Sequence, residues 1–128
     1  MASYLLDATA LIDYLRGRRG IIELLNTLAN QGHQLGLCCV SVAGFYAGLS
    51  EEERAAANRL TDAMEYHEIS REAAKEAGRY RYEFAHRGTT LSTADTLIAA
   101  TAIAEGAILI TANTRDFPME EIELLEHQ

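Results

Sequence analysis

Apolar residues in this chain occur either in short continuous runs or at intervals of three and four. Short apolar runs favour β-strands at residues 4–7, 35–40, 67–69, 107–111 and 122–125. The second run is almost wholly apolar, which is typical of a strand buried on both faces of a parallel sheet. Because helical stretches separate the runs, the pattern predicts an α/β domain in which helical layers enclose a mostly parallel sheet of about five strands.

Start and stop signals bound the predicted helices. The first helix is expected to begin at Asp7 and to end before Gly17, and the second to cover 21–30. Ser41 is expected to cap a helix that reaches about residue 49. The later boundaries are a capping box of Ser50 and Glu53 for a helix to Met64, Ser70 for a helix to His86, and Ser92 or Thr93 before the apolar helix at 97–104.

Length and composition favour a single globular domain, 1–128, expected in the cytoplasm. Hydrophobic residues make up 48% and charged residues 23% of the 128 residues, a usual balance for such proteins. No apolar run approaches the ~20 residues needed to cross a bilayer, and the N-terminal stretch does not resemble a secretory leader. Cys38 and Cys39 are adjacent in an apolar run, so we expect two free thiols and no disulfide.

The charge balance argues against general, sequence-independent binding of nucleic acid. The chain carries 11 basic and 19 acidic residues, a net charge of −8, whereas affinity for phosphates comes mainly from lysine and arginine. If the protein handles RNA, it must use local basic patches and bound cations. An acidic surface also suits a basic protein partner.

Three aspartates are expected at the same edge of the sheet, where the strands end. Asp7 ends the first strand, Asp116 follows the strand that ends at Thr111, and Asp95 lies in the first turn of the intervening helix. Carboxylates without histidine or cysteine favour Mg²⁺ or Mn²⁺. Each aspartate also has a purely structural explanation, as a helix cap, a favourable charge near a helix start, or turn chemistry. Spacing alone leaves both explanations open.

Three sequence blocks resemble those of PIN-domain ribonucleases, and in particular the VapC-type toxins of VapBC toxin–antitoxin systems. They are LLDATALIDYL at 5–15, LSTADTLIAATA at 91–102 and LITANTRDF at 109–117. The blocks follow the order of the family, and the resemblance covers essentially the whole chain. It implies a three-layer PIN-like fold and a metal-dependent endoribonuclease that uses Mg²⁺ or Mn²⁺.

The resemblance also implies roles for individual residues. Asp7, Asp95 and Asp116 would hold the metal and serve as the catalytic carboxylates. The supporting positions would be Thr9 and Thr111, which would hydrogen-bond the cluster, and Asn113, which would orient a ligand or water. The implied partners are an RNA substrate, a cognate antitoxin and a second copy of the chain in a homodimer.

One position departs from the family pattern. The family places a glutamate in a segment such as VAELYAGL, whereas this chain has VAGFYAGL at 42–49, with Gly44 at the glutamate position. Glycine within a helix also lowers stability by roughly 1 kcal/mol relative to alanine. Two interpretations follow: the three aspartates suffice for cleavage, or the chain is a weakened or inactive PIN-fold module that binds antitoxin or RNA.

Two clusters of basic residues are candidate contacts for RNA or antitoxin. Arg16, Arg18 and Arg19 follow the first helix and are suited to either partner. The second cluster, between residues 79 and 87, interleaves arginines with aromatic residues. Such a pattern suits unpaired bases, but packing of the helix face is the favoured explanation there. Asp13 is expected to face solvent or to pair with Arg16.

Overall fold

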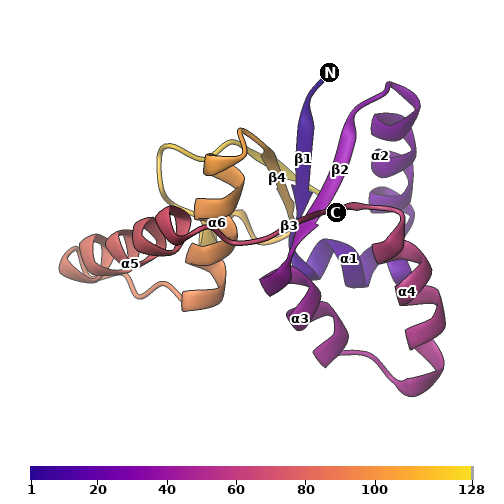
Figure 1. Cartoon of the computed structure of the whole chain (residues 1–128), viewed down its shortest axis with the longest axis horizontal. Helices are drawn as coiled ribbons and strands as arrows, with labels where there is room; N and C mark the ends of the chain where they lie inside the picture. Colours follow the sequence, from indigo (N-terminus) through magenta and orange to yellow (C-terminus); the bar gives the residue numbers. More distant parts are fainter. Residues whose placement is uncertain (128) are drawn as a thin grey trace.

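Five short strands form one parallel sheet in the part of the chain that the structure describes (Figure 1). This computed structural model describes residues 1–127. The strands lie in the order β3-β2-β1-β4-β5, and all four neighbouring pairs are parallel, which confirms the predicted sheet. They are β1 (Ser3–Leu6), β2 (Gln34–Cys38), β3 (Glu65–His67), β4 (Ile108–Thr111) and β5 (Leu124–Glu126).

Helices cover both faces of the sheet and complete three layers (Figure 1). Helices α1, α2 and α4 pack on one face, α5 and α6 on the other, and α3 lies between α1 and α6 below the sheet. The α-helices are α1 (Ala8–Leu15), α2 (Arg19–Asn30), α3 (Cys39–Ala47), α4 (Arg54–Asp62), α5 (Arg71–His86) and α6 (Thr93–Ala104), with 3₁₀ turns η1 (Glu51–Glu53) and η2 (Thr114–Asp116).

Alternating side chains of the central strands divide the core between the two layers. Leu5 and Leu109 are fully buried among residues of α5, α6 and the C-terminal loop. Leu6 and Ile110, their neighbours in sequence, are equally buried but pack against α1, α2 and α3. Successive strand residues point to opposite faces, so near-continuous apolar strands supply both cores. The paired β1 and β4 thus lie at the centre of the sheet, between the two cores.

Several predicted helix ends are confirmed by side-chain caps. The hydroxyls of Ser70 and Ser92 accept hydrogen bonds from the backbone N–H groups of Ala73 and Asp95, each at 3.0 Å. Ser50 and Glu53 form the predicted capping box, here at the start of η1.

Other predicted boundaries were wrong. The second strand ends at Cys38, and Cys39 and Val40 already belong to α3. Ser41 is therefore no cap; it is buried in the first turn, 3.5 Å from the Cys38 sulfur. The third strand covers Glu65–His67 instead of 67–69.

The two cysteines are free thiols, as expected: Cys38 is buried and Cys39 partly buried. No helix within residues 1–127 is long and apolar enough to cross a membrane.

Candidate metal centre

Asp7 joins the end of β1 to the start of α1 and faces the centre of the sheet edge. Its backbone N–H donates to the carbonyl of Ile110 on β4 at 3.2 Å, which extends the pairing of the two strands by one residue. Its side chain then caps α1. The helix-capping role that the sequence suggested for Asp7 is therefore confirmed. The same position orients the carboxylate toward the loop that follows β4.

Both carboxylate oxygens of Asp7 accept hydrogen bonds. Oδ1 accepts from the Thr9 hydroxyl at 2.7 Å and from the Ala10 N–H at 2.9 Å. Oδ2 accepts from the Thr111 hydroxyl at 2.6 Å, across 104 residues of sequence. Asp7 is only 5% exposed, and these bonds compensate the loss of water around its oxygens. They leave this carboxylate with little rotational freedom.

Asp7, Asp95 and Asp116 line one cavity of about 200 Å³. The structure therefore brings together the three aspartates that the sequence placed at one sheet edge. The lining includes no lysine, arginine or histidine. Its other residues are Ala8, Thr9, Val40, Gly44, Ala94, Ile98 and Asn113.

Asp95 occupies the first turn of α6, beside the capping residue Ser92. Partial burial raises the pKa of Asp95 above its ordinary value, and the negative charges of Asp116 and Asp7 add to that rise. A hydrogen bond to the Ser92 hydroxyl opposes the rise in pKa. The carboxylate is thus held where desolvation and like charge disfavour its ionised form.

Asp116 and Asn113 come from the turn after β4. Asp116 ends η2, and its exposed side chain reaches the cavity from the outer rim. The backbone N–H of Asn113 donates to the Thr111 hydroxyl at 3.0 Å. Thr111 is fully buried, so its hydroxyl links this turn to Asp7. Thr111, which was predicted to support the aspartate cluster, therefore contacts both Asp7 and the turn that carries Asp116.

The donor set fits a hard divalent cation that retains water. Only carboxylate, hydroxyl and amide oxygens are available around the cavity, which suits Mg²⁺ or Mn²⁺. Within residues 1–127, no three acidic, histidine or cysteine side chains converge closely enough to enclose an ion by themselves. Mg²⁺ is usually bound through one or two carboxylates and several waters. Asp7, Asp95 and Asp116 fit that kind of site better than a closed cage.

Gly44 faces the same cavity from α3. A Cβ atom at this position would lie 3.1 Å from the Cβ of Ala8 on α1. The absent side chain thus permits close approach of α1 and α3, and it leaves this wall of the cavity without a carboxylate. Refilling the position requires a shift of a few tenths of an ångström between the two helices.

The sequence did not predict the apolar wall of the cavity. Val40 from α3, together with Ala94 and Ile98 from α6, closes the space around the carboxylates. Ile98 lies three residues after Asp95, one helical turn away on the same face. That spacing is the signal that would have identified it.

The basic patch after the first helix is partly occupied by internal contacts. Arg16 donates to the Gly48 carbonyl at 3.1 Å and to Glu53 at 3.3 Å. Asp13 pairs with Arg18 at 3.3 Å, so the predicted pairing of Asp13 with Arg16 was wrong. The left-handed turn at Gly17 folds the chain back, and the Arg18 N–H reaches the Asp13 carbonyl.

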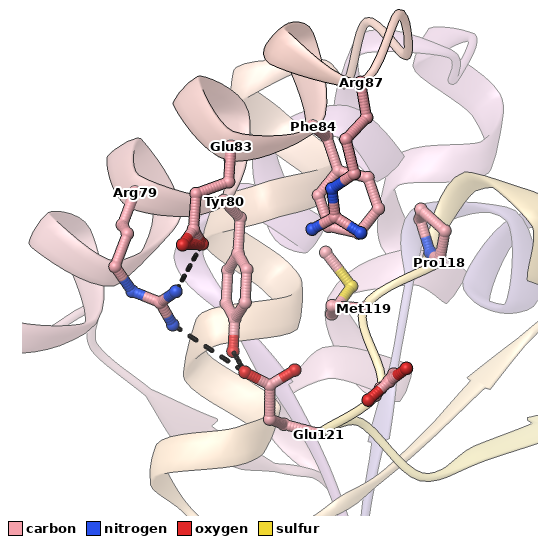
Figure 2. Close-up of a pocket in the computed structure, with 9 residues that line it drawn as sticks. Arg79, Tyr80, Glu83, Phe84, Arg87, Pro118, Met119 and Glu121 are labelled. Carbon is pink, nitrogen blue, oxygen red and sulfur yellow. Dashed lines mark hydrogen bonds and ion pairs between the residues drawn. The ribbon is translucent and has the colours of Figure 1, made fainter.

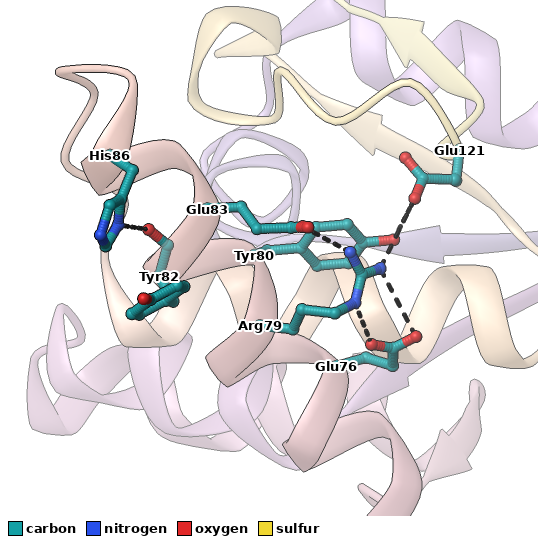
Figure 3. A network of polar contacts seen from close by, with 7 residues as sticks. All are labelled: Glu76, Arg79, Tyr80, Tyr82, Glu83, His86 and Glu121. Atoms are coloured by element: carbon teal, nitrogen blue, oxygen red, sulfur yellow. Dashed lines mark hydrogen bonds and ion pairs between the residues drawn. The ribbon is translucent and has the colours of Figure 1, made fainter.

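The expected packing of the second basic and aromatic cluster is confirmed for two of its aromatic side chains, whereas Tyr82 is 67% exposed. Tyr80 and Phe84 are buried in the core, and the Tyr80 hydroxyl donates to Glu121 at 3.1 Å (Figure 3). Figure 2 shows Arg87 lying over the Phe84 ring beside a separate cavity of about 210 Å³, bordered by Pro118 and Met119. This cavity contains none of the three aspartates.

Comparison with known proteins identifies relatives along nearly the whole chain. The PIN domain family model matches residues 4–122. Ribonuclease VapC19 of Mycobacterium tuberculosis is 37% identical over 117 residues, which cover 90% of this chain and 92% of VapC19.

Solved structures share the fold at lower sequence identity. VapBC2 from Rickettsia felis, bound to a promoter DNA fragment, matches with a TM-score of 0.87 and 20% identity over 98% of this chain and 99% of that chain. DNA-bound VapBC from Salmonella typhimurium matches with a TM-score of 0.83 and 22% sequence identity over 98% of each chain. At these identities the two structures establish the fold alone.

Proposed function

Because this chain belongs to the PIN domain family and is a homologue of a VapC ribonuclease, we propose that it is a metal-dependent endoribonuclease. In this proposal Asp7, Asp95 and Asp116 hold Mg²⁺ or Mn²⁺ and cleave RNA phosphodiesters. The ribonuclease activity of VapC19, 37% identical to this chain, supports the substrate class.

The observation that carries the proposal is a cavity with three carboxylates and no cationic side chain. Burial, and after it the like charges of Asp116 and Asp7, raise the pKa of Asp95 there, and a divalent cation would offset both effects. When bound, such a cation offsets negative charge on the phosphate and activates water. It would also let a protein of net charge −8 accept a polyanion.

The residues of the chain have distinct parts in this proposal. Asp7 is a rigid ligand, because Thr9, Ala10 and Thr111 fix both of its oxygens. Asp95 and Asp116 complete the negative charge from two other segments. Asn113 lines the cavity and offers an amide that can orient water or phosphate.

The proposed biological setting is a toxin–antitoxin pair. The Rickettsia felis and Salmonella typhimurium structures are VapBC complexes with DNA, and by analogy this chain would bind a cognate antitoxin and form a homodimer. Arg18 and Arg19 are exposed after α1 and would contact RNA or the antitoxin. Both partners would be met in the cytoplasm.

A second candidate function follows from Gly44. This residue lines the cavity without contributing a carboxylate, at the position where the family pattern has glutamate. In this alternative the chain retains metal or RNA binding but cleaves RNA slowly or not at all. It would then act by binding antitoxin or RNA.

Cleavage of a mixed RNA pool distinguishes the two candidates. The endoribonuclease proposal expects fragments with Mn²⁺ or Mg²⁺, and none with chelator or in the Asp7→Asn protein. RNA left intact by the unmodified chain, together with retained RNA or antitoxin binding, would favour the inactive module. Cleavage that survives both chelator and Asp7→Asn would contradict both.

A further inference from the structure

Asp95 depends for its position on a short irregular loop. Residues 87–92 connect α5 to α6 without helix or strand, and Asp95 follows in the first turn of α6. Gly88 adopts a left-handed conformation (φ +84°) that reverses the chain direction. A small shift at the end of this loop would move the whole first turn, and with it the Asp95 carboxylate.

Arg81 ties both sides of the α6 cap to the middle of α5. Its Nε donates to the Leu91 carbonyl at 2.9 Å, and its Nη1 donates to the Thr93 hydroxyl, also at 2.9 Å. Leu91 and Thr93 flank the capping residue Ser92, whose hydroxyl accepts from the Asp95 N–H. The Arg81 guanidinium therefore holds Leu91 and Thr93, the residues on either side of Ser92. Ser92 in turn accepts the hydrogen bond from the Asp95 N–H.

The neighbouring arginines of the same segment make different contacts. Arg79 pairs with Glu76, Glu83 and Glu121 (Figure 3). Arg87 lies over the Phe84 ring, with its guanidinium carbon 4.3 Å from the ring centre. Within residues 1–127, Arg81 is in none of the ion pairs. Its donors are committed to the backbone and hydroxyl at the start of α6.

We propose that Arg81 is a positioning residue for the metal centre: it fixes the first turn of α6 and thereby the orientation of the Asp95 carboxylate. The inference rests on the proposed function, because it takes Asp95 to be a metal ligand. Arginine suits this role, since its planar guanidinium presents several donors in a fixed arrangement. A lysine at this position would present one ammonium group on a flexible stem, and we expect it to restore only part of the effect.

Three measurements on the full chain test the role of Arg81. They are the Mn²⁺ dissociation constant by calorimetry, hydrogen exchange of the Asp95 amide without metal, and RNA cleavage as a function of Mn²⁺ concentration. Arg81→Ala is compared with Arg79→Ala, which removes an equal charge from the same helix but breaks contacts with Glu76, Glu83 and Glu121 instead of those with the start of α6. Arg81→Lys and Thr93→Val, which removes one of the two acceptors, provide milder changes if Arg81→Ala folds poorly.

We expect Arg81→Ala to weaken Mn²⁺ binding by about 3- to 10-fold, below the ~10- to 100-fold typical for direct partners of metal ligands. Exchange of the Asp95 amide should accelerate, and cleavage should recover at saturating Mn²⁺ with an unchanged KM for RNA. Arg79→Ala should leave Mn²⁺ binding and Asp95 exchange unchanged. The milder variants should fall between.

Equal Mn²⁺ affinities for Arg81→Ala and Arg79→Ala would overturn the inference while leaving the proposed function intact. A raised KM for RNA with unchanged Mn²⁺ binding would also overturn it, since that result identifies a direct RNA contact. Mn²⁺ binding without any RNA cleavage by the unmodified chain would remove the proposed function alone. Failure of the unmodified chain to bind Mn²⁺ would remove both.

Discussion

Two helices begin at the proposed metal centre, and each brings an aspartate to it in a different way. At the start of α1, Asp7 is 5% exposed and accepts three hydrogen bonds from Thr9, Ala10 and Thr111. At the start of α6, Asp95 is half-buried, and its pKa is raised by burial and by the charges of Asp116 and Asp7. One aspartate is stabilised by the fold, and the other is placed against its electrostatic preference.

This difference separates a structural contribution from a functional one. Asp7 caps a helix and joins two strands, so the fold itself benefits from it. Without a bound cation, the surroundings of Asp95 disfavour its ionised carboxylate. Acidic residues with shifted pKa values of this kind concentrate at functional sites. Substitutions at the two starts should therefore change stability in opposite directions while both impair metal binding.

The largest effect is expected from Asp7→Asn. The amide keeps the size of the side chain but removes a charge and one acceptor oxygen, so a buried hydroxyl loses its partner. RNA cleavage should fall by at least about 100-fold through loss of a ligand, and the free energy of unfolding should drop by about 1–3 kcal/mol. Activity assays and urea denaturation measure the two effects.

Asp13→Asn serves as the matched control for Asp7→Asn. Asp13 lies on the same helix but pairs with Arg18 outside the cavity. Its substitution should leave cleavage within about twofold and change stability by less than about 1 kcal/mol, as for exposed ion pairs. Equal losses in the two proteins would contradict a specific role for Asp7.

A smaller effect is expected from Thr111→Val. Valine preserves the shape but removes the hydroxyl that donates to Asp7 and accepts from Asn113. Mn²⁺ affinity should fall by about 10-fold or more, as for other partners of metal ligands. Thr111→Ser, which retains the hydroxyl, should preserve most of the affinity. Calorimetric titration of Thr111→Val and Thr111→Ser with Mn²⁺ measures the difference. Equal losses of Mn²⁺ affinity in the two proteins would assign the effect to packing instead of the hydroxyl.

Gly44 tests whether a fourth carboxylate adds to the site. Gly44→Ala and Gly44→Glu both place a Cβ 3.1 Å from that of Ala8, so their comparison cancels the shared steric change. Glutamate should strengthen Mn²⁺ binding about 10-fold over alanine, a gain of ~1.4 kcal/mol. The same affinity in both proteins would show that α3 does not supply a ligand here.

The smallest effect, and the one of opposite sign, is expected for Asp95→Asn without metal. Because the folded state raises the pKa of Asp95, its ionised form destabilises the protein at neutral pH. Asparagine should raise Tm by no more than about 3 °C at pH 7, since solvent screens a half-exposed carboxylate.

The pH dependence supplies the check on Asp95→Asn. The advantage of asparagine should be complete above the raised pKa and should vanish as the pH falls through the unfolded-state value near 4. Thermal melts from pH 3 to 8 measure it. A Tm that falls on substitution at pH 7 would contradict the electrostatic contrast between the two helix starts.

The sequence predicted those parts of the molecule that depend on local patterns. Apolar runs located the central strands, and hydroxyl residues such as Ser70 and Ser92 marked helix starts correctly. The rule that ligands bind at strand ends then placed Asp7, Asp95 and Asp116 at one edge. The parallel pairing of β1 and β4 brings Asp7 and the turn that carries Asp116 to this edge, whereas Asp95 reaches it from the first turn of α6.

Features that depend on tertiary contacts could not be predicted in this way. The apolar run at 35–40 does not show where extended backbone becomes helix, so Val40 was assigned to the strand and Ser41 to the cap. The pairing of Arg18 with Asp13 follows from the backbone turn at Gly17. Contacts of Arg81 with Leu91 and Thr93 join segments with no shared pattern.

If the three aspartates bind one divalent cation together, as proposed, a calorimetric Mn²⁺ titration will detect that binding and its loss in each variant. The unmodified chain is expected to bind Mn²⁺ with saturable heat. Asp7→Asn, Asp95→Asn and Asp116→Asn should each weaken binding by about 10-fold or more, whereas Asp13→Asn should bind normally. Equal binding by all five proteins, or none by the unmodified chain, would contradict this proposal.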